Sequence, residues 1–388
     1  MRILTTLTYY RPHYSGLTIY AERLARALVE RGHQVTVLTS RYDPNLTGRE
    51  NRDGVQVIRP HVLMHVSKGV LMPTMIYWAW VNIRRADIVH LHLPQLDAAY
   101  IALICRLMNK PIVLTYHCDL ILPKGFIHSI ANQVSHLANI ISLGSAHQVV
   151  VNTLDYAEES AFLRRYLPKI CAIPTPVELV TPTQTDVEAI MRKARLEPGQ
   201  RIIGMVARLA TEKGVEYLVE AMPEILKVHP TARVLHVGQY QNVLGEEEYA
   251  YKLRPMFQAL GEHWAFLGIL PTAELSAFYQ QCEVTVLPST NSTESFGIVQ
   301  VESMACGTPV VASDIPGVRQ PVKMTGMGRV VPPADAHRLA EGIVQVLDHP
   351  ERYKGDVNGV IKRFSSQHIA EEYEGVFQEL IKGRNSSR

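Results

Sequence analysis

STNSTESFGIVQVESMACGTPVVASDIPGVRQP, residues 289–321, carries more information than any other part of the chain. Its polar first part predicts a loop that ends at Glu294. An apolar run with helical spacing then predicts a helix that opens at Phe296-Gly297-Ile298 and stops at Gly307. The β-branched run Thr308–Ser313 predicts a buried strand. The stretch is therefore a loop, a helix and a strand in succession, as in α/β folds.

Two carboxylates, Glu294 and Glu302, stand eight residues apart in this stretch. Glu294 precedes the helix, whereas Glu302 lies more than one turn inside it. Gly297 lets the backbone approach a ligand closely, and the first N–H groups of a helix attract an anion. We expect the two carboxylates to bind two different parts of one extended ligand. A glycoside hydrolase fits badly, because it needs two carboxylates that face one bond.

The pattern E-S-F-G-x-x-x-x-E-x-M-A-x-G-x-P-V-V resembles the E-x7-E motif of family 4 glycosyltransferases. These are retaining enzymes with the GT-B fold that use nucleotide-sugar donors. Gly204–Gly214 resembles the family segment G-R-L-x-x-x-K-G. Ser15–Leu28 followed by Gly32–Val37 resembles its first loop, helix and second strand, and Thr115-Tyr116-His117 resembles its strand-end T-x-H. The resemblance covers almost the whole chain.

Predicted strands and helices alternate twice along the chain. A Pro/Thr-rich stretch, Ile173–Thr185, separates the two series and is predicted to be a linker. Alternation of this kind indicates parallel sheets with helices on both faces. The predicted fold is α/β of the GT-B class, with two doubly wound Rossmann-like domains that face each other across a deep cleft. The predicted domains are residues 1–175, to which the resemblance adds a crossover helix within 364–388, and residues 176–363.

A nucleotide-sugar donor has an anionic diphosphate leaving group, which needs charge stabilisation. Arg208 offers a guanidinium fork and Lys213 a point cation at one strand end, although both could be solvated surface charges. The helix start at Ile298 and Val299 adds backbone N–H groups, and Gly16 is a further candidate for the diphosphate.

The resemblance implies roles for the glutamates. Glu302 would bind the ribose hydroxyls, which a carboxylate suits because it only accepts hydrogen bonds. Glu294, as a catalytic residue, would bind the transferred sugar together with Ser295, Phe296 and Gly297. The alternative for either glutamate is an exposed helix or loop position.

In the first half, the resemblance makes His117 a catalytic residue beside the donor sugar, and we expect His92 and Tyr14 to line the acceptor cleft. A satisfied core position is the alternative for His117. His90, His92 and His117 could in principle bind zinc, but no metal is expected, since the family chemistry is metal-independent. Ser15-Gly16 replaces the usual pair of glycines in the first loop.

Bulk properties narrow the class of protein. The 388 residues carry a net charge of +2, which gives no argument for nucleic acid. Residues 1–185 hold 18 Lys and Arg against 12 Asp and Glu, whereas residues 186–388 hold 21 against 25. The five cysteines are scattered and form no C-x-x-C, which favours a reducing cytoplasm. No apolar run reaches the length of a transmembrane helix.

Two interpretations fit the apolar, aromatic segments of the first half. Val70–Arg85 places Tyr77, Trp78 and Trp80 beside Arg84 and Arg85, which suits an interfacial helix at the inner face of a membrane. Ordinary packing on the first sheet explains the same residues. Leu120–Leu143 is a second apolar, nearly uncharged segment.

The predicted function is metal-independent, retaining transfer of a hexose-type sugar from a nucleoside-diphosphate sugar to a hydroxyl acceptor, which could be a glycolipid, a polysaccharide or a small-molecule glycoside. No cofactor is expected beyond the donor itself. Two alternatives remain: a nucleotide-sugar isomerase or epimerase on the same fold, and a non-catalytic sugar-nucleotide binding protein.

Overall fold

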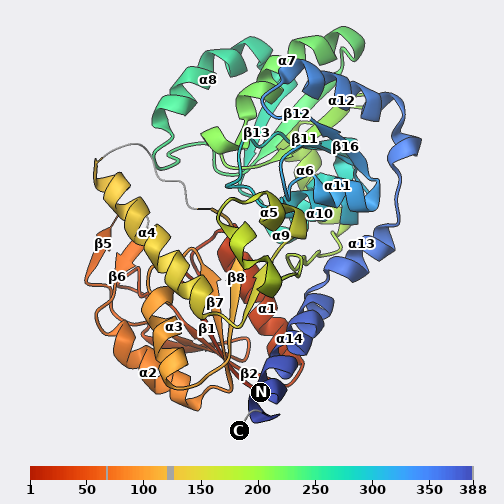
Figure 1. Cartoon of the computed structure of the whole chain (residues 1–388). Coiled ribbons are helices and arrows are strands. Elements are labelled where there is room, and N and C mark those ends of the chain that lie inside the picture. The colour runs from red at the N-terminus through yellow and green to blue at the C-terminus, as the bar shows by residue number, and fades with distance from the viewer. Residues whose placement is uncertain (67–68, 120–125, 387–388) are drawn as a thin grey trace. The chain divides into compact units, whose positions relative to one another are not determined.

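The computed structural model describes residues 1–66, 69–119 and 126–386, and the start of the apolar segment Leu120–Leu143 lies outside them (Figure 1). The chain forms two compact units. The N-terminal unit consists of Met1–Pro176 and Phe364–Arg388, and the C-terminal unit of Val177–Arg363. These bounds differ by one residue from the division at 175 and 176 that the sequence predicts.

The N-terminal unit is built on an eight-stranded sheet of order β10-β9-β8-β7-β1-β2-β4-β3. Every pair is parallel except β3 with β4. The strands are β1 (Arg2–Thr6), β2 (Gln34–Leu38), β3 (Arg49–Arg52), β4 (Val55–Ile58), β7 (Ile88–Leu93), β8 (Ile112–Tyr116), β9 (Gln148–Val151) and β10 (Ile170–Ala172). A separate hairpin pairs β5 (Met64–Val66) with β6 (Gly69–Leu71). The helices are α1 (Gly16–Glu30), α2 (Met75–Arg85), α3 (Ala98–Leu107), α4 (Phe126–Ser145), α5 (Leu154–Glu159) and α14 (Ser366–Ser386).

The C-terminal unit holds a six-stranded parallel sheet of order β13-β12-β11-β14-β15-β16. Its strands are β11 (Arg201–Val206), β12 (Ala232–Val237), β13 (Trp264–Gly268), β14 (Val284–Leu287), β15 (Val310–Ser313) and β16 (Gly328–Val331). Its helices are α6 (Gln184–Ala194), α7 (Val215–Val228), α8 (Glu247–Leu260), α9 (Thr272–Gln281), α10 (Ile298–Ala305), α11 (Gln320–Thr325), α12 (Ala336–Asp348) and α13 (Val357–Phe364).

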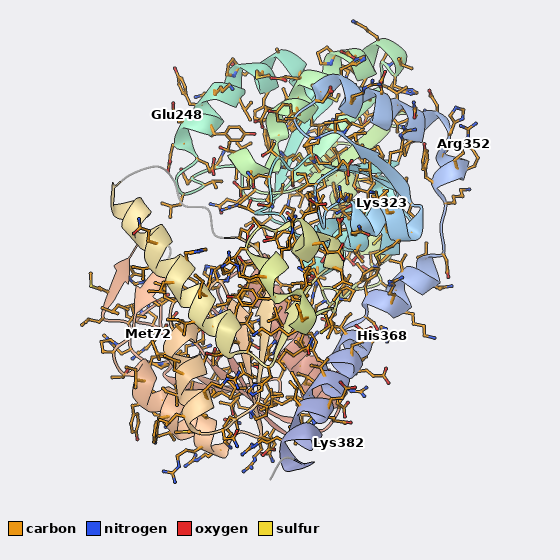
Figure 2. All side chains as sticks on the ribbon, viewed as in Figure 1. Met72, Glu248, Lys323, Arg352, His368 and Lys382 are labelled. Carbon is orange, nitrogen blue, oxygen red and sulfur yellow. The ribbon has the colours of Figure 1, made fainter. Side chains whose placement is uncertain are left out.

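Helix α14 completes the core of the N-terminal unit although it comes last in the chain. Ile369, Tyr373 and Phe377 recur at helical spacing and are fully buried. They join the cluster formed by α1 and the sheet, and α14 lies beside α1 in Figure 1. Figure 2 labels His368 and Lys382 along the same helix. The crossover helix expected within 364–388 therefore packs as part of the first unit.

Helix α1 begins where its sequence provides a cap. The Ser15 hydroxyl accepts from the backbone N–H of Thr18, and the Thr18 side chain accepts from the N–H of Ser15, which is a capping box. Gly16 follows as the first helical residue. The cap fixes the loop before α1 at the carboxyl end of β1, the edge at which ligands of doubly wound sheets bind.

Candidate functional site

An ion pair between Lys213 and Glu294 lies at the centre of the candidate site in the C-terminal unit. Lys213 Nζ is 2.6 Å from Glu294 Oε2, and each side chain is about one-fifth exposed. The other carboxylate oxygen, Oε1, accepts from the N–H of Gly297 at 3.0 Å. The sequence assigned Lys213 to the diphosphate and Glu294 to the sugar, and the structure brings the two charges into direct contact.

The contact depends on Gly214. Its φ of 63° is left-handed, and a Cβ there would lie 2.1 Å from the carbonyl oxygen of Pro288. Glycine therefore lets the turn after β11 press against the loop after β14. A backbone hydrogen bond of 3.0 Å from Thr290 N–H to the Glu212 carbonyl joins the same two loops. The K-G dipeptide thus places the lysine beside Glu294.

The local packing requires glycine at position 297, whether or not a ligand binds there. Its φ is 78°, and a Cβ would lie 2.4 Å from Leu287 Cδ2 and 2.5 Å from Gln300 Nε2. It caps the N-terminus of α10, where the first N–H groups of a helix lack intrahelical partners. Ile298 and Val299 begin that helix, as predicted for backbone contacts with a diphosphate.

Arg208 follows β11 and is exposed, but it is not a solitary charge. Its Nη2 lies 2.5 Å from Glu212 Oε1, four residues later in the chain. Both cations of the predicted diphosphate site therefore have carboxylate partners. A diphosphate would compete with those carboxylates for the two cations.

The electrostatic balance favours the charged form of Lys213. Burial lowers its pKa, but the charge of Glu294 and the hydrogen bond to it outweigh this effect, and the pKa of Lys213 is raised above its ordinary value. The pKa of Glu212 is lowered overall, since the charge of Arg208 and hydrogen bonds overcome the opposing effect of burial. Lys213 therefore keeps its charge at neutral pH.

Glu302 lies in the second turn of α10 and is 6% exposed. The hydroxyl of Tyr279 donates to its Oε2 at 3.3 Å. Burial, followed by the charge of Glu302, raises the pKa of Tyr279 well above its ordinary value, so the phenol stays protonated and remains a donor. The two glutamates of the motif thus have different partners and different surroundings.

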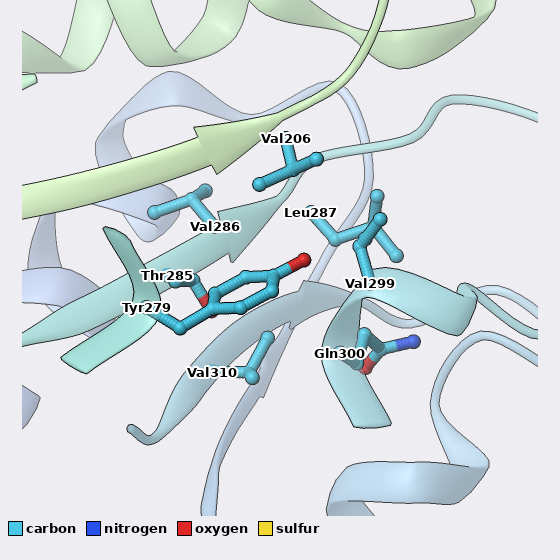
Figure 3. Close-up of a pocket in the computed structure, with 8 residues that line it drawn as sticks. All are labelled: Val206, Tyr279, Thr285, Val286, Leu287, Val299, Gln300 and Val310. Carbon is cyan, nitrogen blue, oxygen red and sulfur yellow. The ribbon is translucent and has the colours of Figure 1, made fainter. Parts of the chain in front are cut away.

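Tyr279 borders a small cavity beneath α10 (Figure 3). Its hydroxyl points toward Leu287 and Val299, and the remaining walls come from β11, β14 and β15. The cavity measures about 10 Å³, room for roughly one water molecule and none for a sugar or nucleotide.

Two residues of the predicted sugar-binding loop are buried. Phe296 is 2% exposed and belongs to the core, and Ser295 is 7% exposed. The Phe296 side chain is therefore unavailable to a sugar, because an apolar ring after a strand end packs inward.

In the N-terminal unit, His117 follows β8 and lies against His92 of β7. His92 Nδ1 and His117 Nε2 are 2.8 Å apart, and the rings stack with centroids 5.1 Å apart. The backbone N–H of His117 donates to the Leu93 carbonyl at 3.1 Å. His117 is 8% exposed and His92 only 1%.

His92 is thus almost completely buried, and its place in an acceptor cleft stays a prediction. Residues two apart on a strand share a face, so His92 follows His90 onto a face of the sheet that is covered by helices. Tyr14 is 62% exposed, with the Arg11 guanidinium 4.8 Å from its ring centroid. A Cβ on Gly16 would meet nothing within 4 Å, so local packing does not demand glycine there.

No group of three or more His, Cys, Asp or Glu side chains within the described residues is arranged to hold a metal ion. His90, His92 and His117 are neighbours, but His92 and His117 hydrogen-bond to each other directly. The zinc alternative is thus not supported by their geometry. No helix in the described parts of the chain is long and apolar enough to cross a membrane.

Two family profiles match the chain. The profile of "Glycosyltransferase Family 4" matches residues 14–180, and that of "Glycosyl transferases group 1" matches residues 186–355. The chain belongs to the family 4 glycosyltransferases. Curated relatives that match this chain over nearly their whole length are also named glycosyltransferases. An uncharacterized glycosyltransferase of Methanocaldococcus jannaschii is 28% identical over 97% of this chain and 98% of its own.

Further relatives of this glycosyltransferase have assigned activities. A D-inositol 3-phosphate glycosyltransferase of Acidothermus cellulolyticus is 27% identical, with 96% of this chain and 87% of the relative covered. A phosphatidyl-myo-inositol mannosyltransferase of Mycobacterium tuberculosis is also 27% identical, with 77% of this chain and 75% of the relative covered.

Solved structures agree in fold. Sucrose-phosphate synthase of Thermosynechococcus elongatus has a TM-score of 0.77 at 23% identity, with 98% of this chain and 99% of that chain covered. HepE of Anabaena, in complex with UDP and glucose, has a TM-score of 0.74 at 19% identity, with 98% and 100% covered. The predicted pair of Rossmann-like α/β domains of the GT-B class is confirmed.

Several residues that shape the site of this glycosyltransferase are not evident from its motifs. Tyr279 and Glu302 are 23 residues apart in the sequence and meet only in the folded chain, and the sequence places Glu212 near Arg208 without indicating that the two form an ion pair. Tyr20 and Tyr373 occupy the core-facing stripes of α1 and α14, where their helical spacing with apolar residues could have predicted burial but not their hydroxyl contacts.

Proposed function

We propose that this glycosyltransferase moves a hexose-type sugar from a nucleoside-diphosphate sugar to a hydroxyl acceptor, with retention of the anomeric configuration and without a metal. The observation that carries the proposal is the Lys213–Glu294 pair beside Arg208, at the carboxyl ends of β11 and β14. A leaving diphosphate needs positive charge, and the α10 N-terminus in the same loop supplies further donors.

A nucleotide-sugar donor is further supported by a solved relative in fold. HepE of Anabaena has been crystallised with UDP-glucose, at a TM-score of 0.69 and 20% identity. In this chain Glu302 would accept hydrogen bonds from the ribose, and Glu294 would contact the transferred sugar while keeping Lys213 in place. His117 in the N-terminal unit would contact the reacting sugar.

The acceptor we propose is a hydroxyl of a phosphorylated or lipid-linked polyol. Two relatives that act on D-inositol 3-phosphate and on phosphatidyl-myo-inositol support this class. The surplus of basic residues in the first 185 positions suits an anionic acceptor.

Peripheral membrane contact belongs to the same proposal. Helix α2 packs through Met75 and Ala79, which are fully buried, but leaves Ile76, Tyr77 and Trp80 between 42% and 62% exposed. The hairpin that precedes it exposes the apolar side chains Leu63 (64%), Met64 (50%) and Leu71 (46%). Arg84 and Arg85 end the helix on the surface. Aromatic side chains beside cations suit a lipid surface with anionic head groups.

A thermal-shift screen against nucleoside-diphosphate sugars tests the donor, since a ligand that binds the folded state raises its melting temperature. The stabilising donor is then incubated with and without polyol acceptors. Nucleoside diphosphate that appears only with acceptor supports transfer, whereas conversion of the donor sugar alone supports the isomerase alternative. Proton NMR of the product's anomeric centre decides retention, and turnover after chelation decides metal independence.

Variants separate the two glutamates. Glu302→Gln should mainly raise the Michaelis constant for the donor, because ribose contacts are equal in ground and transition states. Glu294→Gln should lower kcat. The reverse pattern would overturn the assignment of the two ends of the donor.

Co-sedimentation with vesicles tests the membrane contact. The protein should bind anionic vesicles and not neutral ones. Salt, or the double substitution Arg84→Gln with Arg85→Gln, should weaken this binding.

A further inference from the structure

The core beneath His117 contains a cluster of polar aromatic side chains that the proposed reaction does not use. His92 and His117 share a hydrogen bond of 2.8 Å, and His90 lies against His92 with ring centroids 4.2 Å apart. Tyr20 of α1 packs edge-on against His117 at 4.7 Å and against His92 at 5.9 Å. These rings are almost entirely buried, so each has one fixed set of neighbours.

A chain of hydrogen bonds between hydroxyl groups and His90 holds these rings in place. The Tyr20 hydroxyl lies 2.6 Å from the Tyr373 hydroxyl of α14, which lies 2.7 Å from Thr115 Oγ1. Thr115 Oγ1 in turn lies 2.7 Å from His90 Nε2. These hydrogen bonds connect a helix at the end of the protein to two neighbouring strands, and they fix the rings against which His92 and His117 pack.

All three histidine rings are neutral at ordinary pH. Burial lowers the pKa of His90 and of His117 to about 3, and burial together with the neighbouring histidines lowers that of His92 well below its ordinary value. A neutral imidazole carries one proton, on either Nδ1 or Nε2. In the His92–His117 hydrogen bond one ring must therefore donate and the other accept.

The surroundings of His92 decide which ring donates. Its Nε2 is buried and has no hydrogen-bond partner among the residues that the structure describes. A proton on that atom would be an orphaned buried N–H group, which is rarer in proteins than an unsatisfied acceptor. The proton of His92 therefore belongs on Nδ1, where it is satisfied by His117 Nε2.

We propose that His92 is a positioning residue, which donates from Nδ1 to Nε2 of His117 and thereby locks His117 in the tautomer that carries its proton on Nδ1. In this tautomer the His117 ring carries a neutral N–H on Nδ1, and it cannot act as a base through Nε2. The effect on turnover rests on the role of His117 in the proposed function, whereas the tautomer itself does not.

The tautomer is measured directly on the full chain with histidine labelled by ¹⁵N in the ring, by long-range proton–nitrogen correlation at pH 7. The His117 signals are identified by their loss in His117→Gln. We expect a protonated Nδ1 and a bare Nε2 in the unaltered protein. A His117 ring that carries its proton on Nε2 would overturn the proposal, whatever the variants do.

Two substitutions of His92 form a matched pair. Asn places an amide N–H₂ where Nδ1 lies and can still donate, whereas Leu fills similar space without a donor. His92→Asn should keep the Nδ1–H tautomer of His117 and kcat within about threefold. His92→Leu should yield a mixture of tautomers and lower kcat by at least about tenfold with little change in the Michaelis constant for donor, since a wrong tautomer disables a positioned imidazole. An unchanged His117 tautomer in His92→Leu would contradict the proposal.

The activity of His117→Ala tests whether His117 takes part in the reaction, which is independent of the tautomer that His92 imposes. Full turnover in that variant would remove His117 from the reaction, but the nitrogen spectra would still decide which tautomer His92 imposes. If His92→Leu does not fold, the spectrum of the unaltered protein and the His92→Asn pair remain decisive.

Discussion

Breaking the Lys213–Glu294 pair should reveal how strongly the two loops of the candidate site are coupled. The charges are 2.6 Å apart. Coulomb attraction at this separation is about 6 kcal/mol at an effective dielectric of 20 and about 1.6 kcal/mol in water. The side chains are about one-fifth exposed, and the costs of desolvation and side-chain ordering oppose the attraction. We therefore expect a coupling free energy of about 2–3 kcal/mol.

The assay is a double-mutant cycle of unfolding free energies with Lys213→Met, Glu294→Gln and the double variant. Unfolding of the C-terminal unit must be followed by itself, since a two-unit chain need not unfold in one step. Trp264 is buried in this unit and the other two tryptophans lie in α2. A background with Trp78→Phe and Trp80→Phe makes tryptophan fluorescence report the C-terminal unit alone.

The matched control is the surface pair Arg338–Glu341 in the same unit. Its charges are 2.7 Å apart, but the side chains are 57% and 42% exposed. Solvent screens exposed pairs of this kind, so this pair should show much weaker coupling than Lys213–Glu294. Equal coupling in the two cycles, or a coupling below about 0.5 kcal/mol for the Lys213–Glu294 pair, would refute the inference that burial makes this pair strong.

Three further predictions concern stability. Gly214→Ala should destabilise the C-terminal unit by more than about 2 kcal/mol, because φ is positive and a Cβ would lie 2.1 Å from a carbonyl oxygen. Gly268 has a similar φ but open space around it, so Gly268→Ala should cost only about 1 kcal/mol. Equal losses in denaturant unfolding would argue against the clash. Burial lowers the pKa of His90 and of His117 to about 3, so below about pH 6.5 the unfolded chain binds protons that the folded chain does not. Each ring should therefore cost the N-terminal unit about 1.4 kcal/mol of unfolding free energy per pH unit as pH falls from about 6.5 toward 3, and a flat stability profile between pH 7 and pH 5 would be inconsistent with neutral buried rings. Tyr373→Phe should lower the unfolding free energy of the same unit by about 1–2 kcal/mol through loss of its hydroxyl contacts, and an unchanged unfolding midpoint would show that these contacts are worth nothing.

The sequence predicts the architecture well because the strands of both sheets are continuous apolar runs. The strand predicted at Thr308–Ser313 is present as β15 (Val310–Ser313), and both sheets are built from the two series of alternating strands and helices that the sequence predicts. β3 and the β5–β6 hairpin are among the strands that the sequence did not predict, because they are short and include polar, exposed residues without a clear period of two. Such edge elements depend on pairing partners that a local pattern does not contain.

The site is predictable in its residues but not in its contacts. The motifs identify Glu294, Glu302 and Lys213 as a group, yet the pairing of Lys213 with Glu294 depends on how closely Gly214 lets two loops approach. The burial of His92 follows from helices that cover its strand face, one of which comes from the end of the chain. Contacts between segments far apart in sequence leave no periodic signal in either one.

The placement of α14 has a consequence for how the protein is made. Residues that close the core of the N-terminal unit leave the ribosome only after the whole C-terminal unit has been synthesised. At about 5–20 residues per second, the roughly 190 intervening residues take about 10–40 s to translate. During that time the apolar face of α1 that later receives Ile369 and Phe377 is uncovered. The nascent first unit is therefore a candidate client for chaperones, while the contiguous second unit can fold without waiting for the terminus.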